Sequence, residues 1–128
     1  MFVFQVHFAV QSLDMLGFFD DPKLLERYQV HTSHIIDWVY SLQVNIAQLP
    51  NDQRDKYVKQ AGFKGGNYMG CSIVDGSSQF EGWAYDHGNL AMTYTALCTL
   101  ITLGDDLRKV DRESIIQSLQ FLQLSDGR

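Results

Sequence analysis

Cysteine is scarce in this sequence, and long apolar runs are absent. Cys71 and Cys98 are the two cysteines among 128 residues, and they form no Cys-x-x-Cys pair. This usage argues against a disulfide framework and indicates a reducing compartment, so we expect a cytoplasmic protein. No stretch approaches the ~18 uncharged apolar residues that a membrane-spanning helix requires. The apolar opening segment has no Lys or Arg and is interrupted by His7, Gln11 and Asp14, which argues against a signal peptide.

Basic residues are also few. Ten Lys and Arg stand against fifteen Asp and Glu, which gives a formal net charge of −5. This balance argues against nucleic acid or an anionic membrane surface as the main partner. Hydrophobic residues make up 45% of the chain and charged residues 20%, a composition typical of a folded globular protein. The length suits a single domain over residues 1–128.

An internal repeat is present. The segment "FAVQSLDMLGFFDD", followed later by "HIIDWVYSLQ", resembles "YTALCTLITLGDD" followed by "ESIIQSLQFLQ". At an offset of 87, the matched residues are Leu13, Leu16 and Gly17 with Leu100, Leu103 and Gly104. At an offset of 80, they are Ile35, Ile36, Leu42 and Gln43 with Ile115, Ile116, Leu122 and Gln123. The pattern predicts two units, each built as helix, acidic loop and helix.

The two helices of a unit differ in their apolar pattern. Residues 90–103 carry two adjacent apolar stripes, which predicts a helix buried on several sides that ends at Gly104. The stripes are Leu90, Tyr94, Leu97 and Ile101, and Ala96, Leu100 and Leu103. Residues 111–123 carry one stripe of Ile115, Leu119 and Leu122, which predicts a half-exposed outer helix with Asp111 as its N-cap. We therefore expect an all-α fold of paired helices, arranged as a double-layered ring or solenoid.

A Gly-, Asp- and Ser-rich segment joins the two units. It predicts a short helix around residues 53–60 and then a long loop, which we expect to be ordered by aromatic side chains, namely Phe63, Tyr68, Phe80, Trp83 and Tyr85. Its "GFKGGNYMG" stretch lacks the residue order of a phosphate-binding loop and precedes no suitable helix. A turn-rich packed loop is the better interpretation.

Two groups of residues could bind metal ions. His31 and His34 are three residues apart, but no third ligand with suitable spacing accompanies them, and zinc needs three or four. Asp20-Asp21 and Asp105-Asp106 are similar to the aspartate pairs that hold magnesium and diphosphate in isoprenoid synthases. Each pair follows a glycine that ends a helix, where Asp commonly forms turns and caps the next helix. The turn interpretation is favoured.

Two side chains could take part in catalysis. Cys98 lies within an apolar helix with no basic neighbour in sequence, which favours a packing role over that of a nucleophile. His87 precedes the same helix and could serve as an acid or base, although a loop residue near a helix cap at Asn89 is the favoured interpretation. From the residues alone, no catalytic set is visible.

The second unit carries a family resemblance. The stretch "YDHGNLAMTYTALCTLITLGDDL", followed by "SIIQSLQFLQLSDG", resembles the β subunits of protein prenyltransferases, and most of all those of type I geranylgeranyltransferases. "HIIDWVYSLQ" and "GFKGGNYMG" are similar to the preceding repeat of those subunits. A weaker likeness of "QFEGW" to terpene cyclases comes without their acidic protonation motif.

The resemblance implies a partial α/α toroid whose inner helices line an apolar funnel. In such enzymes geranylgeranyl diphosphate lies in the funnel, and the cysteine of a target protein's C-terminal CAAX motif attacks it. A zinc ion holds that cysteine as a thiolate, and an α subunit completes a heterodimer.

The resemblance also assigns roles to single residues. Phe8 matches an aromatic residue that lines the isoprenoid channel, and Ala91 and Met92 match residues near the last side chain of the CAAX motif. Asn89 stands where the family usually has His beside that pocket. If the alignment extends to the N-terminus, Phe4 stands where type I enzymes have a small Thr and is expected to shorten the channel. The favoured alternative is that "MFVFQ" is an atypical start, outside the register of the family.

The zinc ligands and the basic diphosphate-binding cluster of the family lie in later repeats. The resemblance therefore implies no metal ligands and no catalytic residues in this chain, which covers roughly a third of a family subunit. We expect a fragment that is inactive in isolation and exposes an apolar surface. The alternative is a non-catalytic helical module that binds the α subunit or a lipid.

Overall fold

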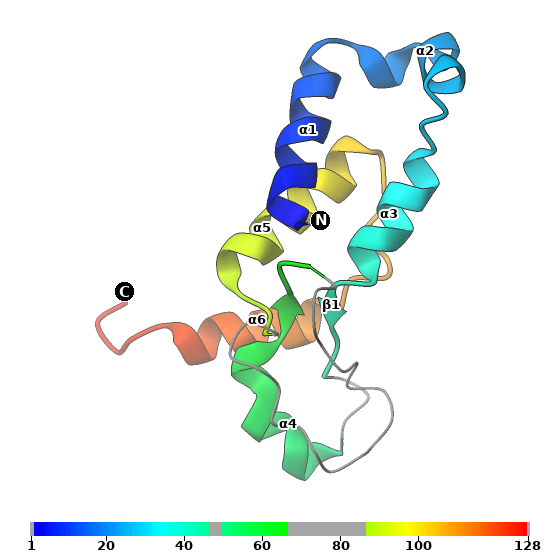
Figure 1. Cartoon of the computed structure of the whole chain (residues 1–128). Coiled ribbons are helices and arrows are strands. Elements are labelled where there is room, and N and C mark those ends of the chain that lie inside the picture. Colours follow the sequence, from blue (N-terminus) through cyan, green and yellow to red (C-terminus); the bar gives the residue numbers. More distant parts are fainter. Residues whose placement is uncertain (1, 47–49, 67–86, 128) are drawn as a thin grey trace.

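The computed structural model describes residues 2–46, 50–66 and 87–127 (Figure 1). The predicted all-helical fold is confirmed, with the addition of one short antiparallel ribbon that the sequence pattern did not predict. In chain order the elements are α1 Val3–Met15, the 3-10 turn η1 Phe18–Asp20, α2 Pro22–Arg27, α3 Thr32–Tyr40, β1 Gln43–Val44, α4 Asn51–Tyr57, the 3-10 turn η2 Val58–Gln60, β2 Gly62–Phe63, α5 Leu90–Thr102 and α6 Arg112–Leu122.

The predicted helix ends are confirmed. Gly104 has a φ of 80°, its N–H bonds to the carbonyl of Ile101, and the N–H of the next residue bonds to the carbonyl of Leu100. This arrangement satisfies carbonyl groups that the last turn of α5 would otherwise leave without partners. Gly17, with a φ of 69°, ends α1 at the equivalent place. Asp111 caps α6 by accepting a hydrogen bond from the N–H of Ser114, as predicted.

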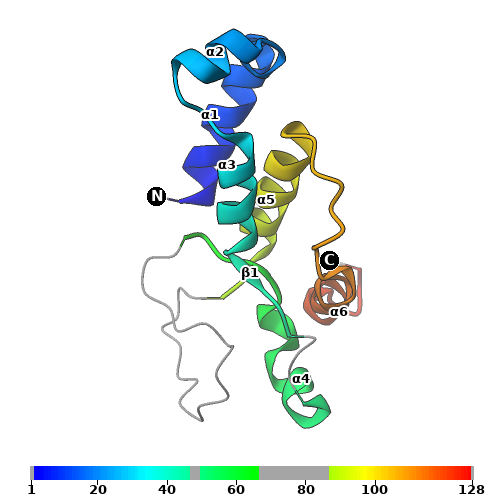
Figure 2. The ribbon, with the colours of Figure 1, turned by 90° about the vertical axis from the view of Figure 1, so that its right-hand side faces the viewer.

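Helices α1 and α5 lie side by side and run in the same direction (Figures 1 and 2). The Gln11 amide donates to Thr102 Oγ1 over 2.7 Å, and His7 Nδ1 lies 3.4 Å from Thr99 Oγ1. The Thr99 hydroxyl already donates its single hydrogen to the carbonyl of Thr95. The contact with His7 is therefore a hydrogen bond only when His7 Nδ1 carries a proton.

The core lies where α3 meets these two helices. Its central side chains have 0% relative exposure and come from four elements and the segment after α3, namely Val3, Val39, Leu42, Phe63, Ala96 and Leu100. The second apolar stripe of α5 is thus buried as predicted. The first is not, because Leu90, Tyr94 and Ile101 are 59%, 63% and 59% exposed. The prediction that this helix is buried on several sides is therefore wrong for its first stripe. The apolar surface that we expected the chain to expose is present on α5.

The predicted burial of α6 was also wrong in detail. Ser114 and Ser118 are its buried residues, whereas Leu119 and Leu122 are 42% and 51% exposed. Helix α6 packs mainly on η2, and small serines allow the two backbones to approach closely. The apolar stripe therefore borders this contact and faces the start of α5.

A short segment, residues 62–66, connects the elements. Strand β2 pairs with β1, with Phe63 opposite Gln43, and the Phe63 N–H donates to Thr93 Oγ1 over 2.9 Å. The Phe63 carbonyl accepts from the N–H of Asn89, and the Gly65 carbonyl accepts from the N–H of Val3. This segment begins the "GFKGGNYMG" stretch, and Phe63 is buried as expected. Tyr68, Phe80, Trp83 and Tyr85 lie outside the described residues.

Helix α3 and the segment after it are tied to the loop between α5 and α6. The Tyr40 hydroxyl donates to Asp105 Oδ1 over 2.5 Å. The Gln43 amide bridges two backbone groups, donating to the carbonyl of Lys109 and accepting from the N–H of Asp111. Burial, together with the hydrogen bond to Asp105, raises the pKa of the Tyr40 phenol above its ordinary value. The two units are thereby joined by side chains as well as by the core.

Substituting Gly62 with alanine tests the close contact at β2. Gly62 has a φ of 124°, and a Cβ added there would lie 2.4 Å from Thr93 Oγ1. We expect Gly62→Ala to lower the free energy of unfolding by about 2–5 kcal/mol, measured by urea denaturation. Gly104→Ala is the matched control, since its φ is 80° but no atom lies within 4 Å. The control should lose only about 1–2 kcal/mol, and equal losses would contradict the role of the Thr93 contact.

The Tyr40 hydrogen bond predicts a dependence of stability on alkaline pH. Because the folded-state pKa is raised, the stabilisation is complete below the unfolded-state pKa near 10 and is lost as pH rises above it. We expect Tyr40→Phe to be less stable by about 1–2 kcal/mol at neutral pH. That difference should shrink when urea unfolding is repeated above pH ~10. Tyr28→Phe serves as the control, because Tyr28 is 60% exposed at the end of α2. A difference for Tyr40→Phe that is constant with pH would refute the proposed linkage.

Candidate functional site

Four aromatic rings form a continuous surface across α1 and α5, here called the aromatic face: Phe4, His7, Phe8 and Tyr94. Phe4 and Phe8 meet edge to face with ring centroids 4.8 Å apart. His7 lies 5.5 Å from Phe8 and 6.3 Å from Tyr94, measured between ring centroids, and so connects the two helices. Such edge-on contacts are favourable arrangements for aromatic side chains.

The aromatic face points away from the core. Val3 and Val10 are the buried residues of α1, and helical periodicity places Phe8 on nearly the opposite side from Val10. Phe4, Phe8 and Tyr94 are 49%, 55% and 63% exposed. Large aromatic side chains that are exposed together, rather than singly, are typical of a surface that binds an apolar ligand or partner.

The predicted site residues fall into different environments. Phe8 belongs to the aromatic face, and Ala91 is exposed one turn before Tyr94 in α5. Met92 is partly buried and packs against the core, where a Cβ at Gly65 would lie 3.8 Å from its sulfur. The structure thus separates Met92 from the exposed face that holds Phe8.

Asn89 is exposed, and its side chain serves as the N-cap of α5. Its Oδ1 accepts a hydrogen bond of 2.9 Å from the N–H of Met92, while its own N–H donates to the Phe63 carbonyl. This cap agrees with the interpretation of His87 as a loop residue beside a helix cap at Asn89. His87 itself is half-buried.

The aspartate pairs serve the turns in which they lie. Asp21 caps α2 by accepting from the N–H of Lys23, and Asp105 accepts from Tyr40 and from the N–H of Leu107. Asp106 accepts from the N–H of Arg108 and forms a 3.0 Å ion pair with that side chain. These contacts support the predicted turn interpretation over magnesium binding.

The described residues do not fit a zinc site. The rings of His31 and His34 lie with their centroids 4.9 Å apart and are tilted by 49° to each other. Within residues 2–46, 50–66 and 87–127, however, no group of three or more His, Cys, Asp or Glu side chains could hold a metal ion. Cys98 is a half-buried free thiol on α5, and a hydrogen bond with it raises the pKa of the Tyr94 phenol. Cys71 lies outside the described residues.

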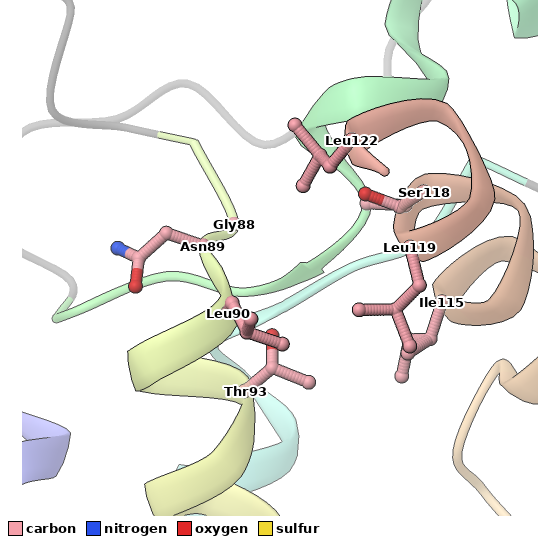
Figure 3. A pocket seen from close by; sticks show the side chains of 9 residues that line it. Gly88, Asn89, Leu90, Thr93, Ile115, Ser118, Leu119 and Leu122 are labelled. Atoms are coloured by element: carbon pink, nitrogen blue, oxygen red, sulfur yellow. The ribbon is translucent and has the colours of Figure 1, made fainter. Parts of the chain in front are cut away.

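A second apolar surface lies between the start of α5 and α6 (Figure 3). It is here called the α5–α6 groove and is lined by Ala61, Gly88, Asn89, Leu90, Thr93, Ile115, Ser118, Leu119 and Leu122. Ile115 and Leu119 of α6 point toward Leu90 and Thr93, whereas the Asn89 amide points away from the groove. The space between these side chains is about 20 Å³, room for about one water molecule.

Sequence reasoning identified Phe8 but missed the aromatic face as a unit. His7 was noted only as an interruption of an apolar run, and Tyr94 only as part of a buried stripe. The signal was available in their spacing: Phe4 and Phe8 are four residues apart, as are Leu90 and Tyr94, which places each pair on one side of its helix. What the pattern could not supply was the parallel pairing of α1 with α5.

Comparisons with known proteins agree with the predicted resemblance. The family model described as prenyltransferase alpha-alpha toroid domain matches residues 2–128. The geranylgeranyl transferase type-1 subunit beta of Dictyostelium discoideum is 35% identical, over 95% of this chain and 34% of that protein. The chain therefore spans about a third of the length of the curated relative it matches.

The fold agrees with this assignment as well. Parallel neighbouring helices, backed by a second layer and built from a repeated helical pair, form an arc of an α/α toroid. Among the described residues, no helix combines the length and the apolar character needed to cross a membrane. The match to the family model over nearly the whole chain, together with the 35% identity, shows that this chain belongs to the prenyltransferase α/α toroid family.

Proposed function

We propose that this chain is part of the β subunit of a type I protein geranylgeranyltransferase, and that its aromatic face contacts the isoprenoid of geranylgeranyl diphosphate. The observation that carries the proposal is the aromatic face itself, four connected rings across two parallel helices, of which Phe4, Phe8 and Tyr94 are exposed. It occurs in a chain that is 35% identical to a geranylgeranyl transferase type-1 subunit beta.

An isoprenoid needs the kind of surface that α1 and α5 offer. The lipid is a branched hydrocarbon that makes no hydrogen bonds, so its binding depends on removing apolar area from water. Phe4 and Phe8 stand half exposed beside each other. Burying a fully exposed ring is worth about 1.5–3 kcal/mol, so covering the exposed half of one of them contributes roughly half of that. The α1–α5 contact already pairs His7 with Thr99 and Gln11 with Thr102.

The remaining predicted residues fit around this surface. In the proposal, the exposed Ala91 leaves room for the last side chain of a CAAX peptide beside the lipid. Met92 supports that position from the core side, and Asn89 holds the first turn of α5 in place through its cap. An α subunit is the proposed partner in a heterodimer.

Zinc remains part of the proposal only at the level of the complete enzyme. The described residues of this chain do not fit the ion, so we propose that other residues of the subunit hold it. No step assigned here to the chain's own side chains passes through a metal. Their proposed work is to bind and orient the lipid and to exclude water from it.

Replacing Phe8 tests lipid contact directly. We expect Phe8→Ser to weaken binding of radiolabelled geranylgeranyl diphosphate to the purified chain by about four- to tenfold, measured by equilibrium dialysis below the micellar concentration of the lipid. Phe121→Ser is the matched control, since Phe121 is 61% exposed but lies on α6. Equal affinities of Phe8→Ser and the unsubstituted chain would contradict the proposal.

A turnover assay separates binding from catalysis. The purified chain is mixed with the α subunit, zinc, geranylgeranyl diphosphate and a CAAX peptide, and lipid transfer is followed by mass spectrometry. We expect no transfer, because no metal ligands or catalytic residues are proposed within this chain. Robust transfer would refute that part of the proposal. If the chain instead binds the lipid with a higher affinity than full-length β subunits do, a non-catalytic lipid-binding module would be favoured.

A further inference from the structure

The hydrogen bonds of Thr99 determine where the His7 ring carries its proton. Thr99 is fully buried, and its hydroxyl donates its single hydrogen to the carbonyl of Thr95 over 2.7 Å. The same oxygen lies 3.4 Å from His7 Nδ1 and can only accept a hydrogen bond there. If Nδ1 carried no proton, two lone pairs would face each other, or the hydroxyl would turn and give up its bond to Thr95. The arrangement therefore favours a proton on Nδ1.

The second ring nitrogen of His7 remains available to change charge. A proton on Nδ1 is present both in one neutral tautomer and in the charged imidazolium, so Nε2 alone separates these two states. Nε2 makes no hydrogen bond with any described residue, and the half-buried ring lies between those of Phe8 and Tyr94. A proton gained at Nε2 thus places a positive charge within the aromatic face without breaking the contact with Thr99.

Few other charges surround His7 among the described residues. Helices α1 and α5 contain no Lys or Arg. The titratable or charged groups on α5, on α1 and on the segments that meet the two ends of α1 are Tyr94, Cys98, Asp14, Lys64 and Asp20. None of them forms an ion pair with His7. A hydrogen bond with Cys98 raises the pKa of the Tyr94 phenol, so that ring stays neutral. Histidine is the side chain that ordinarily changes charge between pH ~5 and ~8.

We propose that His7 makes lipid binding by the aromatic face depend on pH: the uncharged ring, protonated at Nδ1, lets an isoprenoid cover the face, and a further proton on Nε2 weakens that binding. This regulation rests on the proposed function, since it acts on the same face. A hydrocarbon chain offers neither a hydrogen bond nor a counter-charge, so covering an imidazolium with it removes water and supplies nothing in return. The bound lipid and the additional proton therefore oppose each other, and affinity falls as the pH falls.

An uncharged isoprenoid tests this dependence. Geranylgeraniol is the probe, because it lacks the diphosphate, whose own charge varies with pH. We expect the purified chain to bind radiolabelled geranylgeraniol about fivefold or more weakly at pH ~5 than at pH ~8, measured by equilibrium dialysis. The change should follow the titration of the His7 ring in NMR spectra of the same chain. Circular dichroism at both pH values verifies that the helices are intact.

Uncharged variants of His7 isolate its proton. His7→Asn places an amide nitrogen near the position of Nδ1 and cannot gain a charge, so its affinity should be the same at both pH values. His7→Gln should behave in the same way. His31→Asn is the matched control, because His31 is an exposed N-cap of α3 outside the aromatic face, and Asn is well suited to that position. This variant should keep the full pH dependence of the unsubstituted chain.

The position of the proton can be measured without lipid. Long-range nitrogen–proton NMR correlation spectra distinguish the two ring nitrogens, and at pH ~8 neutral His7 should carry its proton on Nδ1. Thr99→Val nearly keeps the shape of the side chain but removes the acceptor, so this preference should be lost. Thr99→Ser keeps the hydroxyl and should retain it.

These measurements separate the regulation from lipid binding itself. Equal affinities of the unsubstituted chain at the two pH values, an equal decline in His7→Asn, or a neutral His7 protonated on Nε2 would each overturn the proposed role of His7. Weaker binding by Phe8→Ser at pH ~8 would still show lipid contact in those cases. Failure of geranylgeraniol to bind at either pH would refute the proposed function and the pH dependence together.

Discussion

The hydrogen bond from the Phe63 N–H to Thr93 Oγ1 is the contact on which the arrangement of the helices depends. It fixes the residue 62–66 segment against α5, and that segment in turn bonds to the start of α1, to Leu42 after α3 and to Asn89 before α5. The close approach is possible because Gly62 has no side chain to collide with Thr93. Phe63 then places its fully buried ring at the centre of the core. The short ribbon thus orients the helices through hydrogen bonds to its backbone.

The sequence of α5 shows how an inner helix can be polar at its contacts without leaving buried groups unsatisfied. Thr93, Thr95 and Thr99 are all buried. The Thr95 and Thr99 hydroxyls donate to backbone carbonyls one turn earlier, and Thr93 accepts from Phe63. Each of these hydroxyls has a hydrogen-bond partner, so burying it leaves no polar group unsatisfied. Small β-branched side chains also let α1 approach closely, which favours neighbouring parallel helices.

Much of the fold could be predicted from the sequence because its signals are local. Gly104 and Asp111 mark helix ends by their own backbone and side-chain chemistry, and the repeated apolar spacing identified both units. The ribbon at β1 and β2 could not be predicted, since strands of two residues carry no period. The exposure of Leu119 could not be predicted either. It follows from the fact that α6 packs on η2 with the face that carries Ser114 and Ser118.

The candidate site was predictable only in part, for a related reason. Phe8 was found through a resemblance, and its environment follows from helical spacing. The bridging role of His7 requires knowing that α1 and α5 run in the same direction, and the inward position of Met92 requires knowing that it packs against a core built from several elements. Such facts belong to pairs of segments far apart in the chain, and a single-segment pattern does not contain them.

The two units differ in the connection between their helices, which is seven residues longer in the first unit, as the offsets of 87 and 80 show. The short helix α2 lies within this longer connection, contributes no buried residue and stands at the edge of the molecule, away from the core (Figure 1). In evolutionary terms, such rims are where insertions can accumulate, because added residues there disturb neither layer of helices. Successive units can thereby acquire distinct outer surfaces while the curvature of the ring stays constant.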